Sequence, residues 1–368
     1  MRAPPLPPSG DRGARSTKTR SLRPFDILLL SHKLERMARI LITGITGQDG
    51  SYLAESHLAS GDEVDGLVRQ SSLLQRTRLD SVPALVKARS TGRLKLHYAD
   101  LSDTSSLVSV LRNVKPETVY HLAGQSHVKI SFDLPEYTAD STGLGTLRLL
   151  ESMRHVVPDA RLFLAATSEI FGEAKESPQN EKTPMNPINP YAAAKVYALN
   201  LVRIYRKAYG VFACAGILFN HESPRRGENY VTRKIARGAA RIARGREKEL
   251  HLGALTPKRD WSYAVDIVDG IRRIASAPKP DDFVLASGLP HSVGEFCEAA
   301  FRVVGLDYAK HVVLDPEYVR LVDITETCGD ASRARNELGW APKTGFLELV
   351  RIMVDAELAD LDAHGDPA

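Results

Sequence analysis

A glycine-rich turn between an apolar strand and an amphipathic helix constrains the fold of this chain more than any other feature. The turn follows the predicted strand 39–43 and precedes a predicted helix from residue 50. It consists of Gly44, Ile45, Thr46, Gly47, Gln48, Asp49 and Gly50. Glycines at G-x-x-G-x-x-G spacing let the backbone approach a diphosphate, and the helix N-terminus supplies N–H donors. The pattern therefore favours a dinucleotide-binding βαβ unit over a tight turn without a ligand.

Short β-rich runs alternate with amphipathic stretches up to about residue 220. The predicted strands are 39–43, 63–68, 94–99, 118–122, 161–167 and 213–219, and the predicted helices are 50–60, 103–113, 136–155 and 191–208. Strands separated by helices of this size form right-handed crossovers in a parallel sheet. The predicted fold class is α/β, a Rossmann-type doubly wound parallel sheet with a smaller, mixed α/β C-terminal substrate lobe.

Three regions follow from this pattern. Residues 37–220 are the predicted NADP-binding Rossmann domain, which a returning strand near 281–287 joins, and residues 221–368 form most of the substrate-binding lobe, with helices at 291–304 and 345–362. Residues 1–36 have no periodic pattern and cannot bury enough apolar surface to order themselves, so we expect a disordered or non-native N-terminal extension. If the extension is non-native, Met37 would be the native first residue. The alternative interpretation is that residues 1–36 are a transit peptide.

The composition of the chain bears on which partners it binds and where it works. The formal net charge is +4, but residues 1–36 carry eight basic and three acidic side chains, so the rest of the chain has a net charge of −1. A body with this balance argues against nucleic acid as a partner. Three scattered cysteines indicate a reducing, cytoplasmic setting. No apolar run reaches the roughly 20 residues that cross a bilayer, so we expect no membrane association.

The end of the second predicted strand distinguishes between nicotinamide cofactors. An acidic residue there would bind the ribose 2′-hydroxyl of NAD, whereas this chain has Arg69, followed by Ser71 and Ser72. A guanidinium and two hydroxyls suit a 2′-phosphate, so the predicted cofactor is NADP. Further cofactor contacts are expected after the third and fourth strands. These residues are Asp100, Leu101, Leu122, Ala123, Gly124, Gln125 and Ser126.

A Tyr-x-x-x-Lys pair supplies the predicted acid–base chemistry. Tyr191 and Lys195 lie one helical turn apart, and a nearby ammonium and a cationic nicotinamide would bring the pKa of the phenol toward neutral pH. Thr167 and Glu169 end the preceding strand. The Glu169 carboxylate offers a second base, which points to elimination rather than simple oxidation, although a capping or solvated glutamate is the alternative.

These residues resemble the extended short-chain dehydrogenase/reductases and, within them, the GDP-mannose 4,6-dehydratases. The likeness runs from about residue 38 to 365 and rests on long stretches at 44–55, 124–133, 136–140, 167–169, 219–227, 231–235, 259–261 and 291–293. The resemblance implies conversion of GDP-mannose to GDP-4-dehydro-6-deoxymannose by internal hydride transfer through bound NADP, in a homodimer or homotetramer. The same dehydration of another GDP-sugar, such as a GDP-heptose, and a non-catalytic NADP-binding module are the alternatives.

The resemblance also implies residue roles. Thr167, Glu169, Tyr191 and Lys195 would be catalytic. Tyr137, His221 and Arg226 would contact the cofactor together with Lys195. The implied substrate-binding residues are Ser126, Ser168, Asn220, Arg226, Val231, Lys234, Arg259 and Arg320. No metal site is expected, because no histidine shows ligand spacing with cysteine or carboxylate partners.

Two departures from the family pattern bear on these roles. The family usually has Arg-Arg-Ser-Ser where this chain has Arg69-Gln70-Ser71-Ser72, in a loop that reaches a neighbouring subunit in tetrameric relatives. The family's late Arg-Pro-Thr-Glu-Val-Asp is replaced by the sequence at 320–325, which keeps Arg320. The first change concerns the tetramer and the second concerns the choice of nucleotide and sugar.

Overall fold

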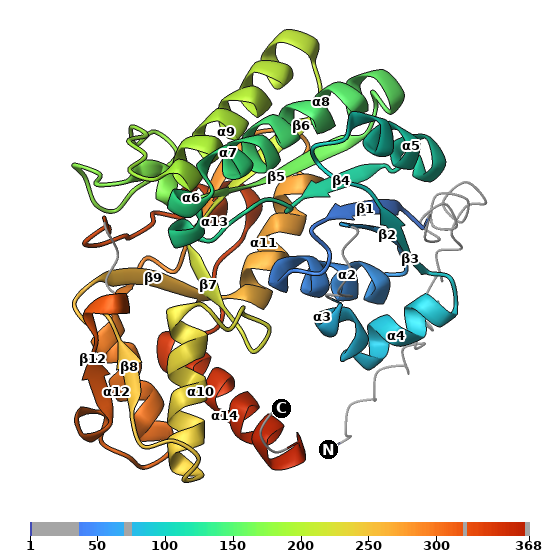
Figure 1. Cartoon of the computed structure of the whole chain (residues 1–368). Helices are drawn as coiled ribbons and strands as arrows, with labels where there is room; N and C mark the ends of the chain where they lie inside the picture. Colours follow the sequence, from blue (N-terminus) through green and yellow to red (C-terminus); the bar gives the residue numbers. More distant parts are fainter. Residues whose placement is uncertain (2–36, 70–75, 319–321, 365–368) are drawn as a thin grey trace. The chain divides into compact units, whose positions relative to one another are not determined.

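The chain is described by a computed structural model that covers Met1 and residues 37–69, 76–318 and 322–364 (Figure 1). It divides into two units, Met1–Met37 and Ala38–Ala368, and the second carries every element described below. The predictions for residues 2–36 and for Ser71, Ser72 and Arg320 lie outside the described residues.

A seven-stranded parallel sheet forms the centre of the second unit, which confirms the predicted fold class. The strands are β1 (Arg39–Thr43), β2 (Glu63–Val68), β3 (Leu94–Tyr98), β4 (Thr118–His121), β5 (Arg161–Thr167), β6 (Ala213–Leu218) and β10 (Asp282–Leu285). Their order is β10-β6-β5-β4-β1-β2-β3, so the direction of winding reverses between β1 and β4. In sheets of this kind, ligands bind beyond the carboxyl ends of the strands at the reversal. β10 is the strand expected near 281–287, and it pairs with β6.

Helices cover both faces of the sheet, because its strands are apolar on both sides. One face packs against α5 (Thr104–Val114), α8 (Gly145–Val156) and α9 (Pro190–Tyr209). The other packs against α2 (Gln48–Ala59), α4 (Pro83–Ser90), α11 (Ala264–Ser276) and α13 (Ser332–Leu338). Figure 1 shows α8 and α9 on the opposite side of the sheet from α2. The site at the carboxyl ends of the strands is therefore built on a rigid two-sided core.

The single helix predicted over 136–155 is interrupted. The segment consists of α6 (Val128–Asp133), α7 (Pro135–Thr138), a π-helical turn η1 (Ala139–Leu144), and only then α8. A further short helix, α3 (Thr77–Asp80), precedes α4 earlier in the chain. The first residue of α8 explains part of this geometry, since a Cβ on Gly145 would lie 2.9 Å from the Leu101 Cβ. The wider turn brings this segment close to the loop after β3, where part of the cofactor site is expected.

A smaller lobe follows β6 along the chain. It contains the sheet β11-β9-β7, the pair β12-β8, and three helices around a third apolar core. Its elements are β7 (Asn220–Glu222), α10 (Val231–Ala243), β8 (Leu250–Leu252), β9 (Lys258–Tyr263), β11 (Pro290–Ser292), α12 (Val293–Val303), η3 (Tyr308–Lys310), β12 (Val312–Leu314), η4 (Pro316–Tyr318) and α14 (Phe346–His364). Trp261, Phe296 and Phe346 pack edge-to-face and stacked in this core. The lobe is mixed α/β, as predicted.

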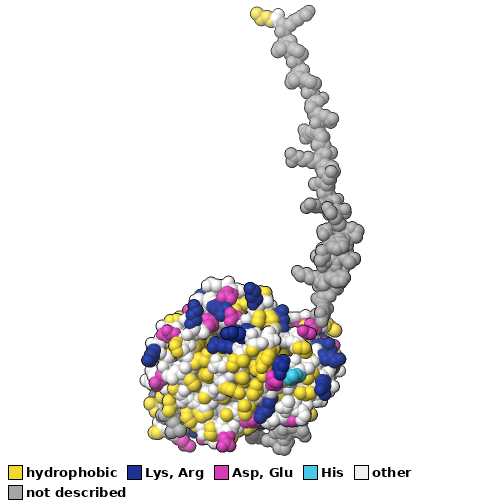
Figure 2. All heavy atoms as spheres, turned by 90° about the horizontal axis from the view of Figure 1, so that it is seen from above, with side chains coloured by type: hydrophobic (Ala, Val, Ile, Leu, Met, Phe, Trp, Pro, Cys, Tyr) yellow, Lys and Arg dark blue, Asp and Glu magenta, His cyan; other side chains and the backbone are white. Residues whose placement is uncertain are grey.

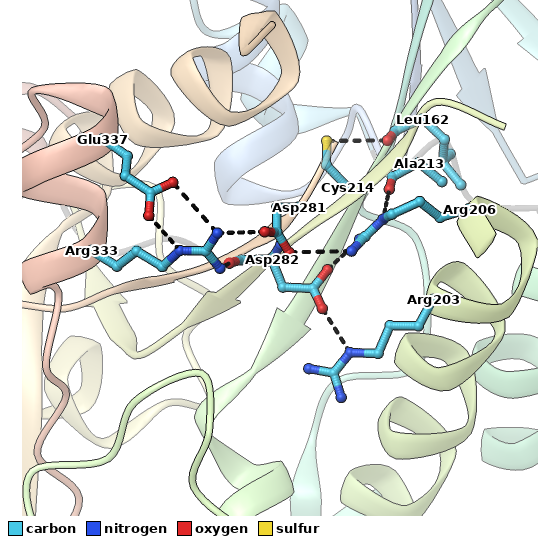
Figure 3. A network of polar contacts seen from close by, with 9 residues as sticks. All are labelled: Leu162, Arg203, Arg206, Ala213, Cys214, Asp281, Asp282, Arg333 and Glu337. Atoms are coloured by element: carbon cyan, nitrogen blue, oxygen red, sulfur yellow. Dashed lines mark hydrogen bonds and ion pairs between the residues drawn. The ribbon is translucent and has the colours of Figure 1, made fainter. Parts of the chain in front are cut away.

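A network of charges fastens α9 to the edge of the sheet (Figure 3). Asp282, at the start of β10, accepts hydrogen bonds from Arg203 and Arg206 of α9, with 2.7 Å between Asp282 Oδ2 and Arg203 Nε. Asp281 accepts from Arg206 and from Arg333 of α13. The network therefore ties the C-terminal half of α9 to β10 and α13.

Candidate active site

The glycine-rich turn lies at the carboxyl end of β1, where the sheet order reverses. Gly44 has a φ of +75°, and a Cβ there would lie 2.8 Å from the Ala123 nitrogen. A Cβ on Gly50 would lie 2.3 Å from the Gly44 carbonyl oxygen. No side chain caps α2, whose N-cap residue is Gly47. The turn thus presents bare backbone at a helix N-terminus, which fits a dinucleotide diphosphate.

The side chains of Gln48 and Asp49 are held by the segment after β6. Gln48 Nε2 donates to the His221 carbonyl oxygen at 3.1 Å, and Gln48 Oε1 accepts from Ser223 Oγ at 2.8 Å. Asp49 Oδ2 lies 2.8 Å from His221 Nε2. Because the two side chains are engaged in these contacts, residues 48–49 would contact a dinucleotide through their backbone. The contacts also join the glycine-rich turn to β7.

The His221 imidazole has acceptors on both nitrogens. Its Nδ1 lies 2.7 Å from the Phe219 carbonyl oxygen, opposite the contact with Asp49. Burial by itself would lower the pKa of His221, but the Asp49 carboxylate outweighs it and the pKa is raised. Burial would raise the pKa of Asp49, and His221, Gln48 and Arg226 outweigh it and lower that pKa. The pair is therefore charged in the fold.

The predicted adenosine end contains a contact between two expected cofactor residues. Arg69, exposed at the end of β2, donates a hydrogen bond to the Tyr137 hydroxyl. Asp100 accepts from its own loop at Ser102, and the carbonyl oxygen of Leu101 accepts from Arg148. The structure thus brings Arg69 and Tyr137 together.

The loop after β4 is held from beneath by a chain of hydrogen bonds. The Ala123 N–H donates to Thr43 Oγ1, which lies 2.8 Å from His121 Nδ1. His121 Nε2 lies 3.1 Å from Thr146 Oγ1, whose hydroxyl donates to the Thr142 carbonyl oxygen. Because Thr146 donates there, His121 carries its proton on Nε2 and accepts at Nδ1. Burial lowers the pKa of His121 to about 3, so this histidine is neutral.

The rest of that loop faces the smaller lobe. Gly124 has a φ of +155°, and a Cβ there would lie 3.1 Å from Thr142 Oγ1. The Gln125 backbone N–H donates to the same Thr142 hydroxyl at 3.2 Å. Ser126 Oγ lies 3.1 Å from the hydroxyl of Tyr230, at the N-cap of α10. The loop that contains Leu122 and Ala123 therefore connects the large sheet to the start of α10.

Three of the four predicted catalytic residues meet at the start of α9. Tyr191, on the first turn, is buried and hydrogen-bonded to Thr167. Lys195 is one turn further, with Nζ 5.9 Å from the centre of the Tyr191 ring and 2.7 Å from the Ala165 carbonyl oxygen, to which it donates. Burial lowers the pKa of Lys195 to about 8. The predicted hydroxyl–phenol–ammonium set is thus assembled.

In the chain alone, the pKa of Tyr191 is raised. Burial raises the pKa of its phenol, and the neighbouring Tyr230 and Glu169 raise it further, against the lowering effects of Thr167 and Arg226. The Lys195 ammonium, one of the two positive charges expected to lower this pKa, donates to the Ala165 carbonyl oxygen. The lowering expected with a cationic nicotinamide as the second charge stays a prediction.

Glu169 lies in η2 (Ser168–Phe171), the turn that follows β5. Its backbone N–H donates to Thr167 Oγ1 at 3.3 Å, and its Oε2 accepts from Asn189 Nδ2 at 3.0 Å. The neighbouring Ser168 is buried. The carboxylate is near enough to Tyr191 to act on its pKa, so the structure brings all four predicted catalytic residues together.

Most predicted substrate residues lie around β7, α10 and β9. The Arg226 guanidinium lies 3.7 Å from the Tyr230 ring centre and pairs with Glu222. Asn220 begins β7 and Val231 begins α10. Lys234 Nζ lies 3.5 Å from the centre of the Tyr318 ring. The Arg259 guanidinium pairs with Asp323 at 2.6 Å and donates to the Ile324 carbonyl oxygen.

Three site residues were not predicted from the sequence. Tyr230 contacts both Ser126 and Arg226. Arg78 donates to the carbonyl oxygens of Thr46 and Arg225, and so bridges the glycine-rich turn and the loop before α10. Asn189 caps α9 and contacts Glu169. Only Asn189 carries a sequence signal, since an asparagine before a proline is a typical helix start.

Two general properties concern the described residues only. Within 37–69, 76–318 and 322–364, no group of three histidine, cysteine or acidic side chains could hold a metal ion. No helix in the same ranges is long and apolar enough to cross a membrane.

Fold and site together define a dinucleotide-binding enzyme of the extended short-chain dehydrogenase/reductase class. The structure of UDP-glucose 4-epimerase from Thermus thermophilus, determined with NAD, has 26% sequence identity and a TM-score of 0.75, and the match covers 87% of this chain and 98% of the epimerase. The family model described as GDP-mannose 4,6 dehydratase matches residues 41–353.

Closer relatives agree with the family model. GDP-mannose 4,6 dehydratase of Drosophila melanogaster is 47% identical over 337 residues, which covers 86% of this chain and 85% of the relative. GDP-mannose 4,6 dehydratase 1 of Arabidopsis thaliana is 48% identical over 322 residues, which covers 86% and 89% respectively. The chain belongs to the GDP-mannose 4,6-dehydratase family, which confirms the resemblance predicted from its motifs.

Proposed function

We propose that this chain carries out the reaction of its family, the dehydration of GDP-α-D-mannose to GDP-4-dehydro-6-deoxy-D-mannose as an NADP-dependent hydro-lyase. The observation that carries the proposal is the meeting of Thr167, Glu169, Tyr191 and Lys195 at the carboxyl ends of β5 and the start of α9. A simple dehydrogenase of this class needs the hydroxyl, phenol and ammonium alone. The carboxylate beside them suits the removal of a second proton.

Tyr191 is the proposed base for the first step. It takes the proton of the sugar 4-hydroxyl, while Thr167 hydrogen-bonds the same oxygen. When bound, a nicotinamide would supply the hydride chemistry between C4 and C6, and a positive charge on it would favour the phenolate that burial disfavours. Lys195, held by the Ala165 carbonyl, orients the nicotinamide ribose.

Glu169 is the proposed base for the elimination. The 4-keto group acidifies the proton on C5, Glu169 removes it, and the 6-hydroxyl leaves as water after it receives a proton from the same carboxyl group. When hydride reaches C6, C5 takes up a proton that balances the one Tyr191 removed from the 4-hydroxyl, so Tyr191 and Glu169 both end in their starting states. The sugar loses one molecule of water, and the cofactor ends in its starting state.

Replacement of Glu169 by Gln tests this role, because Gln keeps the size of the side chain and loses the base. We expect turnover of GDP-mannose to fall by roughly 10²-fold or more, which is the usual contribution of a general acid–base group. Glu173→Gln is a matched control, since Glu173 is an exposed glutamate just beyond the same turn. Turnover at the wild-type rate in Glu169→Gln would exclude the proposed base.

NADP is the proposed cofactor because Arg69, and not a carboxylate, directly follows β2. Arg69 is exposed, and its contact with the Tyr137 hydroxyl orients the guanidinium. Arg69→Ala should weaken binding of NADP while NAD binding changes little, as measured by calorimetric titration. Tyr137→Phe removes only the orienting hydroxyl and should produce a smaller effect in the same direction. Equal losses for both cofactors would contradict the assignment.

We propose that the large sheet and the smaller lobe bind different ligands. Residues 37–220 with β10 bind the cofactor, and the remainder of 221–368 binds most of the GDP-sugar. Ser126, Ser168, Asn220, Arg226, Val231, Lys234 and Arg259 are the described residues proposed to contact the substrate. The positive charges of Arg226, Lys234 and Arg259 suit its diphosphate.

Self-association is the proposed quaternary arrangement, as a homodimer or homotetramer. Figure 2 shows a large hydrophobic area on the face seen from above, the side on which α8 and α9 lie in Figure 1. Over 193–204 the exposed residues of α9 are Ala193, Tyr197, Asn200 and Ile204, none of which is charged, and the exposed Lys207 follows them. Such a stripe is unusual on a solvated helix, and two copies of it meet without like-charge repulsion. Ile204→Glu should shift the mass measured by light scattering to that of a single chain. A cytoplasmic location is proposed because the chain has only three scattered cysteines.

A further inference from the structure

The side chain of Asn189 connects the helix that carries Tyr191 to the carboxylate of Glu169. Its Oδ1 accepts a hydrogen bond from the Ala192 N–H at 2.8 Å, which caps α9, and its Nδ2 donates to Glu169 Oε2 at 3.0 Å. The Ala192 N–H requires an acceptor, so the amide orientation is fixed and the NH₂ group must face the carboxylate. Asn189 is only 8% exposed, which shields both bonds from bulk water.

The backbone around Asn189 packs tightly against the turn that contains Glu169. The Asn186 N–H donates to the Ile170 carbonyl oxygen at 2.9 Å. Gly172, which ends this turn with a φ of +53°, lies so close to the same segment that a Cβ would be 1.9 Å from the Asn186 carbonyl oxygen. Segment 186–189 and turn 168–172 are therefore packed directly against each other, and Asn189 adds a side-chain hydrogen bond to Glu169.

We propose that Asn189 is a positioning residue that holds the Glu169 carboxylate at a fixed place relative to Tyr191. The inference rests on the proposed role of Glu169 as the base for C5. Tyr191 and Glu169 then act on neighbouring carbons of one sugar, so their separation has to match the C4–C5 pair. A bond from the N-cap of α9, two residues before Tyr191, sets that separation.

Asn189→Ser separates the two functions of this side chain. Serine caps a helix about as well as asparagine does, but its side chain is one bond shorter and lacks the second polar atom that contacts Glu169. We expect an unchanged KM for GDP-mannose and a kcat about tenfold lower. The deuterium isotope effect on kcat with C5-deuterated GDP-mannose should increase, because C5 proton removal becomes slower.

Two further variants complete the experiment. Asn189→Asp keeps the cap and replaces the N–H donor by a carboxylate that repels Glu169, so kcat should fall further than in Asn189→Ser. Ser292→Ala removes the cap of α12, whose serine accepts from the Glu295 N–H far along the chain. That variant should unfold at a lower temperature and keep the wild-type kcat and isotope effect.

Wild-type kcat values and isotope effects in both Asn189→Ser and Asn189→Asp would overturn the proposal, whatever happens to the unfolding temperature, and would leave Asn189 as a helix cap only. The experiment also distinguishes a failure of the proposed role of Glu169 from a failure of the proposed role of Asn189. If Glu169→Gln keeps turnover, then Glu169 is not the base. If Glu169→Gln is inactive and both Asn189 variants are kinetically normal, the base is correct and the positioning inference is wrong.

Discussion

Asp282 should contribute more to stability than its surface position at the sheet edge suggests. Its carboxylate is 4% exposed and accepts from both Arg203 and Arg206, one of them on each oxygen (Figure 3). Asp282→Asn keeps the shape and removes the charge. Hydrogen bonds to charged groups contribute roughly 1.5–3 kcal/mol each, and removal of one partner of a buried pair costs roughly 3–5 kcal/mol. The arginines are partly exposed, so we expect a loss of about 3 kcal/mol in the free energy of unfolding.

The magnitude can be checked by urea unfolding against a matched variant. Glu337→Gln removes an exposed carboxylate from the same network. The Glu337 side chain pairs with Arg333 and is 51% exposed. Exposed pairs contribute about 0–1 kcal/mol, so this variant should be close to wild type. The kcat of Asp282→Asn at low temperature should be unchanged, because α9 has 20 residues and its ends are about 30 Å apart. A loss below 1 kcal/mol for Asp282→Asn would refute the argument that burial makes this carboxylate important.

Three other predictions follow from the site. Gly172→Ala should lower both stability and kcat, because its Cβ would lie 1.9 Å from the Asn186 carbonyl oxygen. Gly210→Ala is the control, since Gly210 has a φ of +68° and its Cβ would have nothing within 4 Å. That variant should cost only about 1–2 kcal/mol of backbone strain and leave kcat unchanged. The Asp49–His221 pair should stabilise the fold fully between the ordinary pKa values of 3.8 and 6.5. That contribution is lost as the pH rises through the higher folded pKa of His221, and again as it falls through the lower folded pKa of Asp49. In Asp49→Asn the unfolding free energy should therefore depend less on pH in both regions. The imidazole of His121 should show no titration by NMR above about pH 4, because burial lowers its pKa to about 3, and its effect on stability should become unfavourable as the pH falls below 6.5.

The first half of the fold could be predicted from sequence because its signals are local. Buried parallel strands form short apolar runs, and Arg39–Thr43, Glu63–Val68 and Arg161–Thr167 have the predicted bounds. The smaller lobe was not predictable in the same way. Its strands β7, β8 and β11 have three residues each, which is too short for any periodicity, and they form through pairing with distant segments. Helix α11 was missed although Ile267, Ile271 and Ile274 repeat at helical spacing and are all buried.

The candidate site shows the same limit at the level of single residues. Tyr191, Lys195 and Thr167 could be found because a helix start and a strand end are local features. Their electrostatics could not, since the pKa of Tyr191 depends on burial and on Tyr230, which is distant in sequence. Asn189 was predictable as a helix cap, but its bond to Glu169 depends on how segment 186–189 packs on turn 168–172.

Helix α9 is fastened at both ends, and the two attachments have different consequences. At its start, Asn189 contacts Glu169 and Tyr191 lies beside Thr167, so the two proposed bases are attached to the same helix end. Near its end, Arg203 and Arg206 are bound to β10. A loosened C-terminal attachment should lower the stability of the sheet edge, but the first turn keeps its own contacts. A loosened N-terminal attachment should separate the two proposed bases although the core stays intact. Substitutions near Asp282 should therefore change unfolding without changing the isotope effect, and Asn189→Ser should do the reverse.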